Sequence, residues 1–509
     1  IDGSTFSQVL ILLDGVRVND PQTGHHNLNL ALDPADLERV ELTYGAGSAV
    51  HGPDALGGVI NLVPKSSVLP RADVAARWGA SLDDVASGVA SDASLRWGWQ
   101  GDWGSAWVSG GKRRSDGYRE DTDFDEDRVF VHAELPTAGG QLSIDAGVQD
   151  KVFGARDFYA PYPSREWTTA QSAAVTYHRG ALTLRGYGRR HRDRFVLIAA
   201  DPAVYDNRHR SVLAGTEGFV RHRMGGTDLA IGGELVHEGI DSNNLGDRSR
   251  LRGSLFGELG RRIGTHWRLL SGLRVDHHES FGWEASPSLS ASRDLGDGRI
   301  FASAARSYRA PSFTETWYSD PNNVGNADLG AERSWQFEAG SNMPVVGFTV
   351  EGAVFLRQES NLIDYVRPAD QPPWQAQNLG EMETVGVRLR ARRNWRHVRA
   401  EAGFTWVDKE QTLATGLESK YVFTHPVQQL TARLHHDLPM GAAADWQLGG
   451  RKRLAPLDDY AVLDLNVSLP VRPGRVLLRL RNLTNERYEA VAGVPMPGRW
   501  YGLETRVDL

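Results

Sequence analysis

Apolar and polar residues alternate along most of the chain, from about residue 72 to its end. In the segment RVFVHAEL, residues 128–135, Val129 and Val131 share one face while Phe130 and His132 share the other. A period of two is that of a β-strand, whose successive side chains point to opposite faces. The same pattern recurs at residues 348–358, 386–393, 460–469 and 476–483. This part of the chain is therefore predicted to be all-β.

Three features favour a membrane β-barrel over a soluble β-sandwich. The alternating segments continue for roughly 440 residues, which is more than one sandwich uses. Polar stretches at residues 113–128 and 368–383 alternate with tight turns at 224–226 and 294–298, as long loops and short turns do in an outer-membrane barrel. Trp and Tyr gather near segment ends, as at residues 96–107, where aromatic girdles would lie at the membrane surface.

The number of strands follows from the length of the repeating part. A hairpin with one short turn and one long loop takes about 40 residues, so residues 71–509 are predicted to form roughly 22 antiparallel transmembrane strands. A barrel of that width is plugged rather than open, and residues 1–70 are the predicted plug domain inside its lumen. The glycine-rich segment at residues 45–58 lacks both the third glycine of a dinucleotide fingerprint and the Gly-Lys-Ser/Thr of a P-loop. We interpret its glycines as residues that allow tight turns and close backbone packing within the plug.

Composition narrows the possible functions. The chain has no cysteine, which argues against disulfides and thiolate metal sites, and no run of 18 apolar residues that would make a transmembrane helix. The net charge of -7, without a basic domain, argues against nucleic acid as a partner. Neither an HExxH nor a G-x-S-x-G signature occurs, so we do not expect an enzyme. A passive porin or a structural barrel stays an alternative, although either leaves residues 1–65 without a role. The chain starts at Ile1 without a signal peptide, so we expect a processed or truncated chain.

Five motifs, in order, resemble those of the TonB-dependent outer-membrane receptors. They are residues 9–20 and 37–65 of the predicted plug, 307–318 together with 325–340 in mid-barrel, 378–391, and 480–507. The resemblance covers nearly the whole chain and implies a bacterial outer-membrane protein in contact with outer-membrane lipid. It also implies import of a scarce nutrient, driven by a TonB-type energy-coupling protein. A surface lipoprotein is a further candidate partner.

Departures from the family pattern concern the contact between plug and barrel. Tyr44 stands where the family usually has Arg, and Arg388 where it often has a Glu that helps to hold the plug. We expect Arg39 to pair with Glu338 instead, because a part-buried arginine needs a carboxylate. The segment that carries the TonB box in the family is not in this sequence, so contact with the coupling protein follows from the resemblance alone.

The resemblance also indicates a class of nutrient. No His lies from residue 312 to 325, where haem receptors of the family usually have one. Residues 152–167 and 189–197 look most like cobalamin receptors, so a corrinoid is preferred and a ferric siderophore is the alternative. The candidate ligand-binding residues are polar positions of a plug loop and loop aromatics: Asn19, Asp20, Gln22, His25, His26, Asn27, Tyr159, Tyr162 and Trp167. Alternatively, the polar residues belong to a solvated plug loop that binds no ligand, and the aromatic residues belong to the interfacial girdle or pack within loops.

An acidic segment is a candidate cation site. Asp121, Asp123, Asp125 and Asp127 alternate along the chain and offer hard oxygen ligands, which suit calcium in an extracellular loop. The spacing is not that of an EF-hand, and a solvated acidic loop is the alternative. No cofactor is expected to be required. His277 and His278 are adjacent and would point to opposite faces of a strand, so they are not expected to chelate a metal together.

Overall fold

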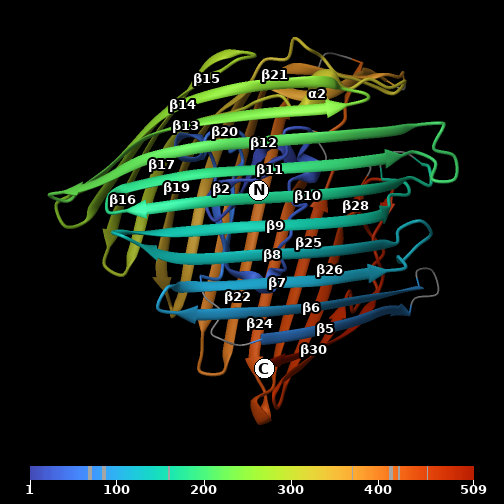
Figure 1. Cartoon of the computed structure of the whole chain (residues 1–509). Helices are drawn as coiled ribbons and strands as arrows, with labels where there is room; N and C mark the ends of the chain where they lie inside the picture. Colours follow the sequence, from blue (N-terminus) through green and yellow to red (C-terminus); the bar gives the residue numbers. More distant parts are fainter. Residues whose placement is uncertain are drawn as a thin grey trace.

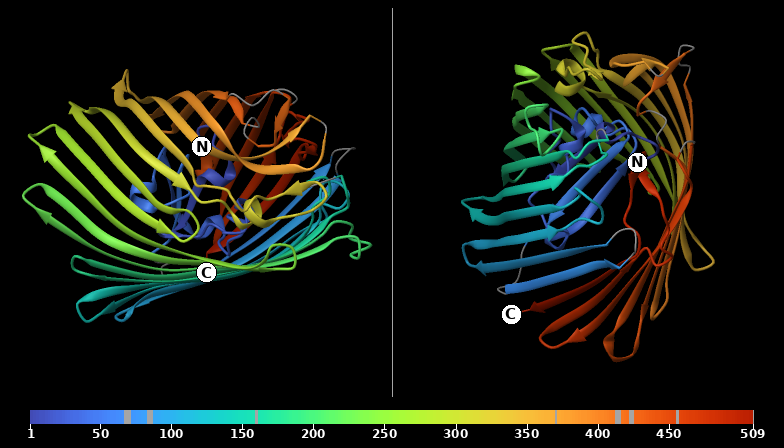
Figure 2. Two further views of the ribbon diagram at one scale, coloured as in Figure 1. Left: turned by 90° about the horizontal axis from the view of Figure 1, so that it is seen from above. Right: turned by 90° about the vertical axis from the view of Figure 1, so that its right-hand side faces the viewer.

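The chain closes into a β-barrel around its own N-terminal part (Figure 1). The structure is a computed structural model that describes all residues except 67–71, 83–86, 159–160, 370, 412–415, 422–424, 455–456 and 509. Figure 2 shows the N-terminal segment inside the ring of strands in both views. The last strand, β30, pairs with the first barrel strand, β5, and this pairing closes the sheet.

The barrel strands follow one another in sequence order around the sheet. Two of them, β18 (Asn323–Val324) and β23 (Leu417–Ser419), are short additions to the sheet. The other 22 strands within the described residues pair antiparallel with their neighbours, which confirms the predicted number. They are β5 Ala72–Leu82, β6 Ser87–Gly101, β7 Gly104–Ser115, β8 Phe124–Thr137, β9 Gly140–Gly154, β10 Arg165–Arg179, β11 Leu182–Val196, β12 Asp206–Met224, β13 Thr227–Ser242, β14 Gly246–Ile263, β15 Trp267–His278, β16 Gly282–Leu295, β17 Gly298–Arg309, β19 Glu332–Val345, β20 Phe348–Pro368, β21 Trp374–Asn394, β22 Val398–Gln411, β24 Pro426–Asp437, β25 Ala443–Arg453, β26 Tyr460–Val471, β27 Gly474–Arg481 and β30 Trp500–Asp508.

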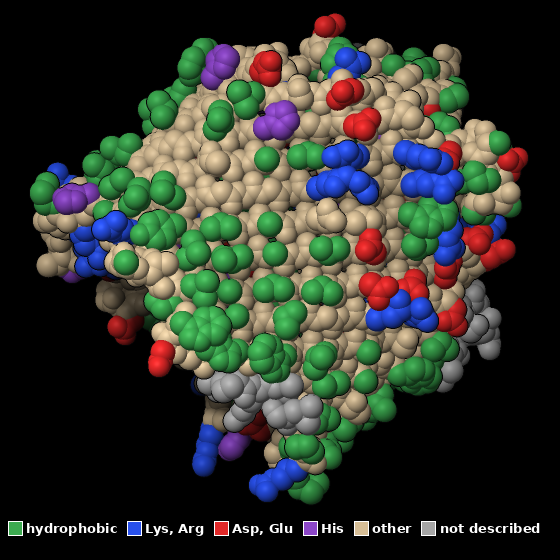
Figure 3. Space-filling view, viewed as in Figure 1, with side chains coloured by type: hydrophobic (Ala, Val, Ile, Leu, Met, Phe, Trp, Pro, Cys, Tyr) green, Lys and Arg blue, Asp and Glu red, His purple; other side chains and the backbone are tan. Residues whose placement is uncertain are grey.

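The two faces of the wall differ as the alternation predicts. On β8, Val129 is 50% exposed on the outside, whereas Phe130 and His132 are buried against the plug side. Figure 3 shows hydrophobic side chains across the outer face of the strands, with charged side chains gathered toward their ends. The inner face is polar because it meets the plug and the wet lumen instead of lipid. Among the described residues, no helix has the length and apolar character needed to cross a membrane.

The plug is a small sheet of four strands in the order β2-β1-β4-β3. Its strands are β1 Val9–Leu13, β2 Val16–Arg17, β3 Leu37–Tyr44 and β4 Gly58–Pro64, with single-turn helices η1 Phe6–Gln8, η2 Gly24–His26, η3 Pro34–Asp36 and α1 Ser48–His51. Val9 and Ile11 pack against Trp107 and Phe130 of the barrel wall, so plug and barrel share one apolar core. Gly45 has φ +78°, and a Cβ there would lie 2.5 Å from the Gln336 side chain, so close packing does require this glycine.

Three details differ from the sequence prediction or lie beyond it. The polar stretch at residues 368–383 is mostly strand, and half of the stretch at 113–128 belongs to β7 and β8, because hydrogen-bonded ladders continue after the apolar alternation ends. A short helix, α2 (Phe313–Trp317), follows β17, where only strands and loops were expected. The predicted boundary between residues 70 and 71 lies outside the described residues; the plug sheet ends at Pro64 and β5 begins at Ala72. Further short elements are η4 Pro439–Gly441, β28 Glu489–Val491 and β29 Val494–Pro495.

Candidate ligand-binding site

A cavity of about 640 Å³ lies at the end of the barrel where the longer loops are, above the plug. The plug contributes Phe6, Gln22 and His25, and the loops that join barrel strands contribute most of the remaining surface. The loop and wall residues of the lining include Tyr162, Glu166, Asp193, Phe195, Tyr205, His209, Arg309, Glu315, Tyr318, Asp320, Tyr365, Arg367, Trp374, Lys420 and Tyr421. A molecule in this cavity therefore touches both the plug and the barrel.

Aromatic rings form much of the cavity surface. The Phe6 ring lies 4.2 Å from the His25 ring and meets Tyr421 edge-on at 5.9 Å between centroids. Phe6 is 40% exposed although it sits on a plug inside a barrel, so its ring faces open cavity space. At the opposite rim the Tyr205 and Tyr318 hydroxyls hydrogen-bond at 2.5 Å. This surface suits a flat or bulky ligand with apolar faces.

The charges of the lining are nearly balanced. It holds four carboxylates, Glu166, Asp193, Glu315 and Asp320, and three cationic side chains, Arg309, Arg367 and Lys420. Arg309 binds Glu315 through two hydrogen bonds of 2.9 and 3.0 Å, and Arg367 binds Glu418 at 2.9 Å. Lys420 donates to Asn323 at 2.9 Å and lies near three aromatic rings. Removal from bulk water lowers the pKa of Lys420.

Of the nine predicted ligand-binding residues, four line the cavity: Gln22, His25, His26 and Tyr162. Enclosure by the barrel and the nearby Lys420 lower the pKa of His25 to about 4, so its imidazole is neutral at pH 7. Burial and the neighbouring His191 hold the pKa of His26 well below its usual value. Tyr159 lies outside the described residues. Trp167 lies on the outer face of β10 and stacks on Arg194 at 5.1 Å, away from the cavity.

Asn19, Asp20 and Asn27 are buried and shape the plug loop instead of facing the cavity. The Asn19 carboxamide accepts from the Ile11 amide at 2.7 Å, and the Asn27 carboxamide accepts from the Asp20 amide at 2.8 Å. Asp20 accepts from the Ser211 hydroxyl of β12 at 3.0 Å. These three residues therefore hold the loop in place, so that Gln22, His25 and His26 reach the cavity.

Most of the aromatic lining was not predicted. Phe6, Tyr205, Tyr318, Trp374 and Tyr421 come from five separate segments of the chain. One local signal was available for Tyr318, because Ser312 and Glu315 have the spacing of a helix capping box. That box is present in α2, which ends at the Tyr318 rim.

The structure corrects the predicted contact between Arg39 and Glu338. Arg39 is exposed on β3 and pairs with Glu41 at 2.7 Å. Glu338 pairs instead with Arg388 of β21 at 2.6 Å, and Arg388 also contacts Asp2 of the plug. The Arg388 guanidinium lies 4.0 Å over the Tyr44 ring. Glu338 therefore pairs within the barrel, and Arg388 is the residue that contacts both Glu338 and the plug.

The four predicted calcium ligands are not brought together. Asp121 pairs with Arg156 at 2.6 Å, and Asp123 with Arg165 at 2.8 Å. Asp125 and Asp127 share Lys112, at 2.8 and 2.7 Å. Each carboxylate already has a cationic partner, so a calcium ion would have to displace several ion pairs. Calcium binding by this segment stays a prediction.

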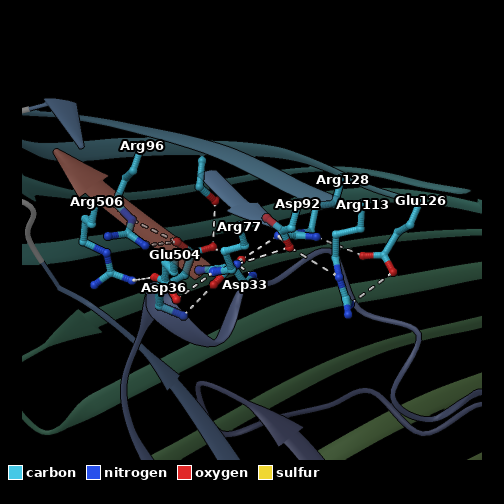
Figure 4. A network of polar contacts seen from close by, with 12 residues as sticks. Asp33, Asp36, Arg77, Asp92, Arg96, Arg113, Glu126, Arg128, Glu504 and Arg506 are labelled. Carbon is cyan, nitrogen blue, oxygen red and sulfur yellow. Dashed lines mark hydrogen bonds and ion pairs between the residues drawn. The ribbon is translucent and has the colours of Figure 1, made fainter. Parts of the chain in front are cut away.

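A buried network of charges holds the plug to the wall next to β5–β8 (Figure 4). Asp36 of the plug is fully buried and accepts from Arg96 at 2.5 and 2.9 Å and from the Ser109 hydroxyl at 2.7 Å. Asp33 accepts from Arg128 at 2.5 Å and from Arg77 at 3.2 Å. Charge-assisted hydrogen bonds of this kind are the stronger ones in proteins, so the network anchors the plug.

Comparison with known proteins gives two family matches. The sequence model described as TonB dependent receptor-like β-barrel matches residues 33–483, and the TonB-dependent receptor plug domain matches residues 1–59. Among curated proteins, the vitamin B12 transporter BtuB of Photobacterium profundum is 23% identical over 77% of this chain and 66% of that protein, just under two thirds of its length. BtuB of Vibrio vulnificus is 23% identical over 98% of this chain and 84% of that protein.

Solved structures share the fold at lower sequence identity. The siderophore receptor PirA from Pseudomonas aeruginosa has a TM-score of 0.81 and 18% identity, covering 100% of this chain and 93% of that one. A mutant ferric enterobactin receptor, PfeA, from the same organism, in complex with enterobactin, has a TM-score of 0.83 and 17% identity over 100% and 93%. At such identities the likeness shows the architecture and not the ligand.

Proposed function

Because the chain belongs to the TonB-dependent receptor family, whose members are outer-membrane transporters and receptors, we propose that it imports a large nutrient into the periplasm. The nutrient binds from outside in the cavity above the plug. A TonB-type protein supplies the energy by pulling on the plug, because binding alone does not move a ligand uphill. Outer-membrane lipid surrounds the barrel.

One observation carries this proposal: the plug and the barrel both contribute residues to the lining of the cavity. Phe6, Gln22 and His25 belong to the plug, whereas Tyr205, Tyr318 and Trp374 belong to the barrel and its loops. A ligand held by both parts loses its contacts with the plug when the plug moves. Displacement of the plug therefore weakens binding and opens a route at the same time, as import requires.

A corrinoid is the ligand that we propose, with a ferric siderophore as the alternative. Four carboxylates and three cations in the lining, two of the cations already bound to carboxylates, offer little to a strongly anionic chelate. The aromatic surface and the hydrogen-bonding side chains suit a flat macrocycle that carries amide groups. The vitamin B12 transporters among the relatives support the same choice, and the siderophore receptors among the solved structures support the alternative.

Calorimetry on the purified protein in detergent tests the proposal. We expect submicromolar binding of cobalamin, weakened about tenfold by Phe6→Ala, because the lost aromatic contact is worth about 1.4 kcal/mol. Trp167→Ala removes a ring of larger size from the outer face and is the matched control, with unchanged affinity expected. Binding of ferric siderophores without cobalamin would establish the alternative. A steady ion conductance in planar bilayers, with no binding of either ligand, would make the protein a passive porin.

A further inference from the structure

Three metal-ligating side chains converge under the cavity. They are His26 from the plug loop and His191 and Asp193 from β11, and their ligand atoms all lie within 4.8 Å of one another. All three residues are buried. No other group of this kind occurs among the residues that the structure describes.

The fold explains why these residues meet. The strand period places His191 and Asp193 on the same, lumen-facing side of β11, and the pairing with β12 sets His209 opposite Asp193. Arg189, on the same face of β11, donates to the His26 carbonyl at 2.6 Å and also contacts the Val18 carbonyl. The plug loop is thereby held with the His26 ring beside the His191 ring, at 4.3 Å between centroids and with the ring planes tilted by 31°.

The cluster has polar atoms that the protein itself leaves unsatisfied. His191 Nδ1 and Asp193 Oδ1 are buried without a hydrogen-bond partner. His26 Nε2 lies 3.7 Å from Asp193 Oδ1, and His191 Nδ1 lies 3.5 Å from Asp20 Oδ2, both too far for good hydrogen bonds. Buried polar groups nearly always bind a protein group, an ordered water or an ion, so two unpaired atoms within one cluster of metal-ligating side chains are consistent with a bound ion there.

We propose that His26, His191 and Asp193 bind one divalent transition-metal ion at the floor of the cavity. Tetrahedral coordination with bonds of about 2.0–2.2 Å separates ligand atoms by about 3.3–3.6 Å. The 3.7 Å between His26 Nε2 and Asp193 Oδ1 therefore needs only a small adjustment, and the other two distances, which are at most 4.8 Å, must shorten by up to about 1.5 Å. Glu166 lies 4.0 Å from His26 Nδ1, and His209 lies 4.0 Å from Asp193 Oδ2, close enough to support the first three ligands. His26, Glu166, Asp193 and His209 all line the cavity, which gives the ion a way in from outside.

The ligand set selects the class of metal. Two imidazoles and a carboxylate suit Zn²⁺, Ni²⁺, Co²⁺ or Cu²⁺, whereas Mg²⁺ and Ca²⁺ prefer oxygen ligands alone. The buried carboxylates Asp20, Glu166 and Asp193 surround the site. Against these three carboxylates stand two cations among the described residues: Arg189 lies 3.8 Å from Asp20, and Lys151 donates at 3.1 Å to Asn29, which contacts both histidines. A divalent cation would therefore offset a local excess of negative charge.

The site bridges the plug and the barrel. His26 moves with the plug, and His191 and Asp193 stay with the wall. A bound ion thus ties the plug loop to the barrel, and displacement of the plug breaks the coordination and frees the ion. This inference stands on the cluster alone and does not depend on which nutrient the cavity accepts.

Metal titration of the full chain tests the site. Protein in detergent is treated with a chelator and titrated with Zn²⁺ alone by calorimetry, and with Co²⁺ alone by visible absorption. We expect one ion per chain, a tetrahedral Co²⁺ spectrum, and no heat with Mg²⁺. His191→Ala and Asp193→Asn should each weaken Zn²⁺ binding by about 100-fold, because each removes one of three bonds.

A matched control comes from another buried histidine of the wall. His132 on β8 pairs with Asp145 at 2.8 Å but belongs to no three-ligand group among the described residues, so His132→Asn should bind Zn²⁺ normally. If a variant fails to fold, hydrogen exchange of the wild-type plug loop, residues 19–29, gives a second readout: Zn²⁺ should slow its exchange. The inference is overturned if the wild type binds no stoichiometric ion, or if His191→Ala and Asp193→Asn bind as the wild type does. Nutrient binding is measured separately, so failure here leaves the proposed transport intact.

Discussion

Arg388 shows, at the scale of single residues, how this barrel holds its plug with a rearranged set of charges. Its guanidinium contacts Asp2 of the plug and Glu338 of the barrel and lies over the Tyr44 ring. A cation above an aromatic face is attracted by the ring quadrupole, more strongly when both are removed from water. Tyr44 and Arg388, the two residues that depart from the family pattern, therefore belong to one contact. In this contact the arginine lies on the barrel wall, whereas the family usually has an arginine at the plug position of Tyr44. Local sequence patterns could not pair them, because 344 positions separate them in the chain.

Removal of the Arg388 side chain should loosen the start of the plug. In Arg388→Ala the carboxylates of Asp2 and Glu338 lose their shared partner in a mostly buried place, which costs about 3 kcal/mol. We expect faster hydrogen exchange of residues 1–8, with little change in β1. Arg390→Ala is the control, since Arg390 lies two residues further on the same strand and forms a half-exposed pair with Glu401 at 2.8 Å. Equal exchange in the two variants would show that Arg388 does not hold the plug.

At the scale of elements, the strands could be predicted and the small helix could not. Alternation and length gave the strand period and the strand number, because lipid on one side and water on the other impose a strict two-residue rhythm. Strand residues beyond the lipid layer need not alternate between apolar and polar. β20 and β21 are therefore longer than the segments in which apolar and polar residues alternate. The cavity lining was predictable only in part, because its plug residues share one loop while its aromatics meet only through the closure of the barrel.

The helix α2 connects the cavity rim to the plug. The Phe313 amide donates to the Pro21 carbonyl at 2.9 Å, and the Thr314 amide donates to the Gln22 carbonyl at 3.1 Å. Its start is fixed by a capping box, in which the Ser312 hydroxyl accepts from the Glu315 amide at 3.2 Å and the Ser312 amide donates to the Glu315 carboxylate at 2.7 Å. Loss of the cap should therefore increase the mobility of both the cavity rim and the plug loop.

Loss of this cap should weaken nutrient binding; Ser312 itself lines the cavity, so the control must keep its hydroxyl in place. Ser312→Ala removes the hydroxyl acceptor and costs about 1 kcal/mol of local stability. We expect faster hydrogen exchange of residues 313–318 and a several-fold lower affinity for the nutrient, because ordering of the rim must then be supplied by binding. Ser312→Thr keeps a hydroxyl and should behave as the wild type does. Identical behaviour of the alanine and threonine variants would contradict a role for the cap.

At the scale of the whole molecule, the plug is held in a wide ring by charged contacts in addition to the apolar core that it shares with the wall. Asp33, Asp36 and their arginine partners connect it to one part of the wall (Figure 4), and Asp2, Arg388 and Glu338 connect it to another. Such contacts are directional and can be exchanged for water when the lumen is wetted, whereas a fully apolar interface would resist any movement. A plug fixed in this way stays closed at rest and can still be moved by a partner that pulls on it.

Acid should open this closed state in a defined range of pH. Burial alone would raise the pKa of Asp33, but the Ala35 amide, Arg77 and Arg128 outweigh it and bring the pKa to about 2, below the usual 3.8. A lowered pKa means stabilisation that is complete above about pH 4 and is lost as pH falls toward 2. The difference corresponds to roughly 2 kcal/mol of plug anchoring at pH 7.

Conductance in planar bilayers measures this anchoring directly, because a displaced plug leaves a wide aqueous pore. The wild type should be closed at pH 7 and should show more frequent openings as pH falls from about 4 to 2. Asp33→Asn should open more often already at pH 7 and should respond less to acid in that range, since its side chain carries no charge to lose. Asp228→Asn removes an exposed carboxylate that pairs with Arg223 at 2.5 Å and should match the wild type throughout. If Asp33→Asn stays as tightly closed as the wild type at every pH, the plug is held by its apolar packing against Trp107 and Phe130, and the charges only orient it.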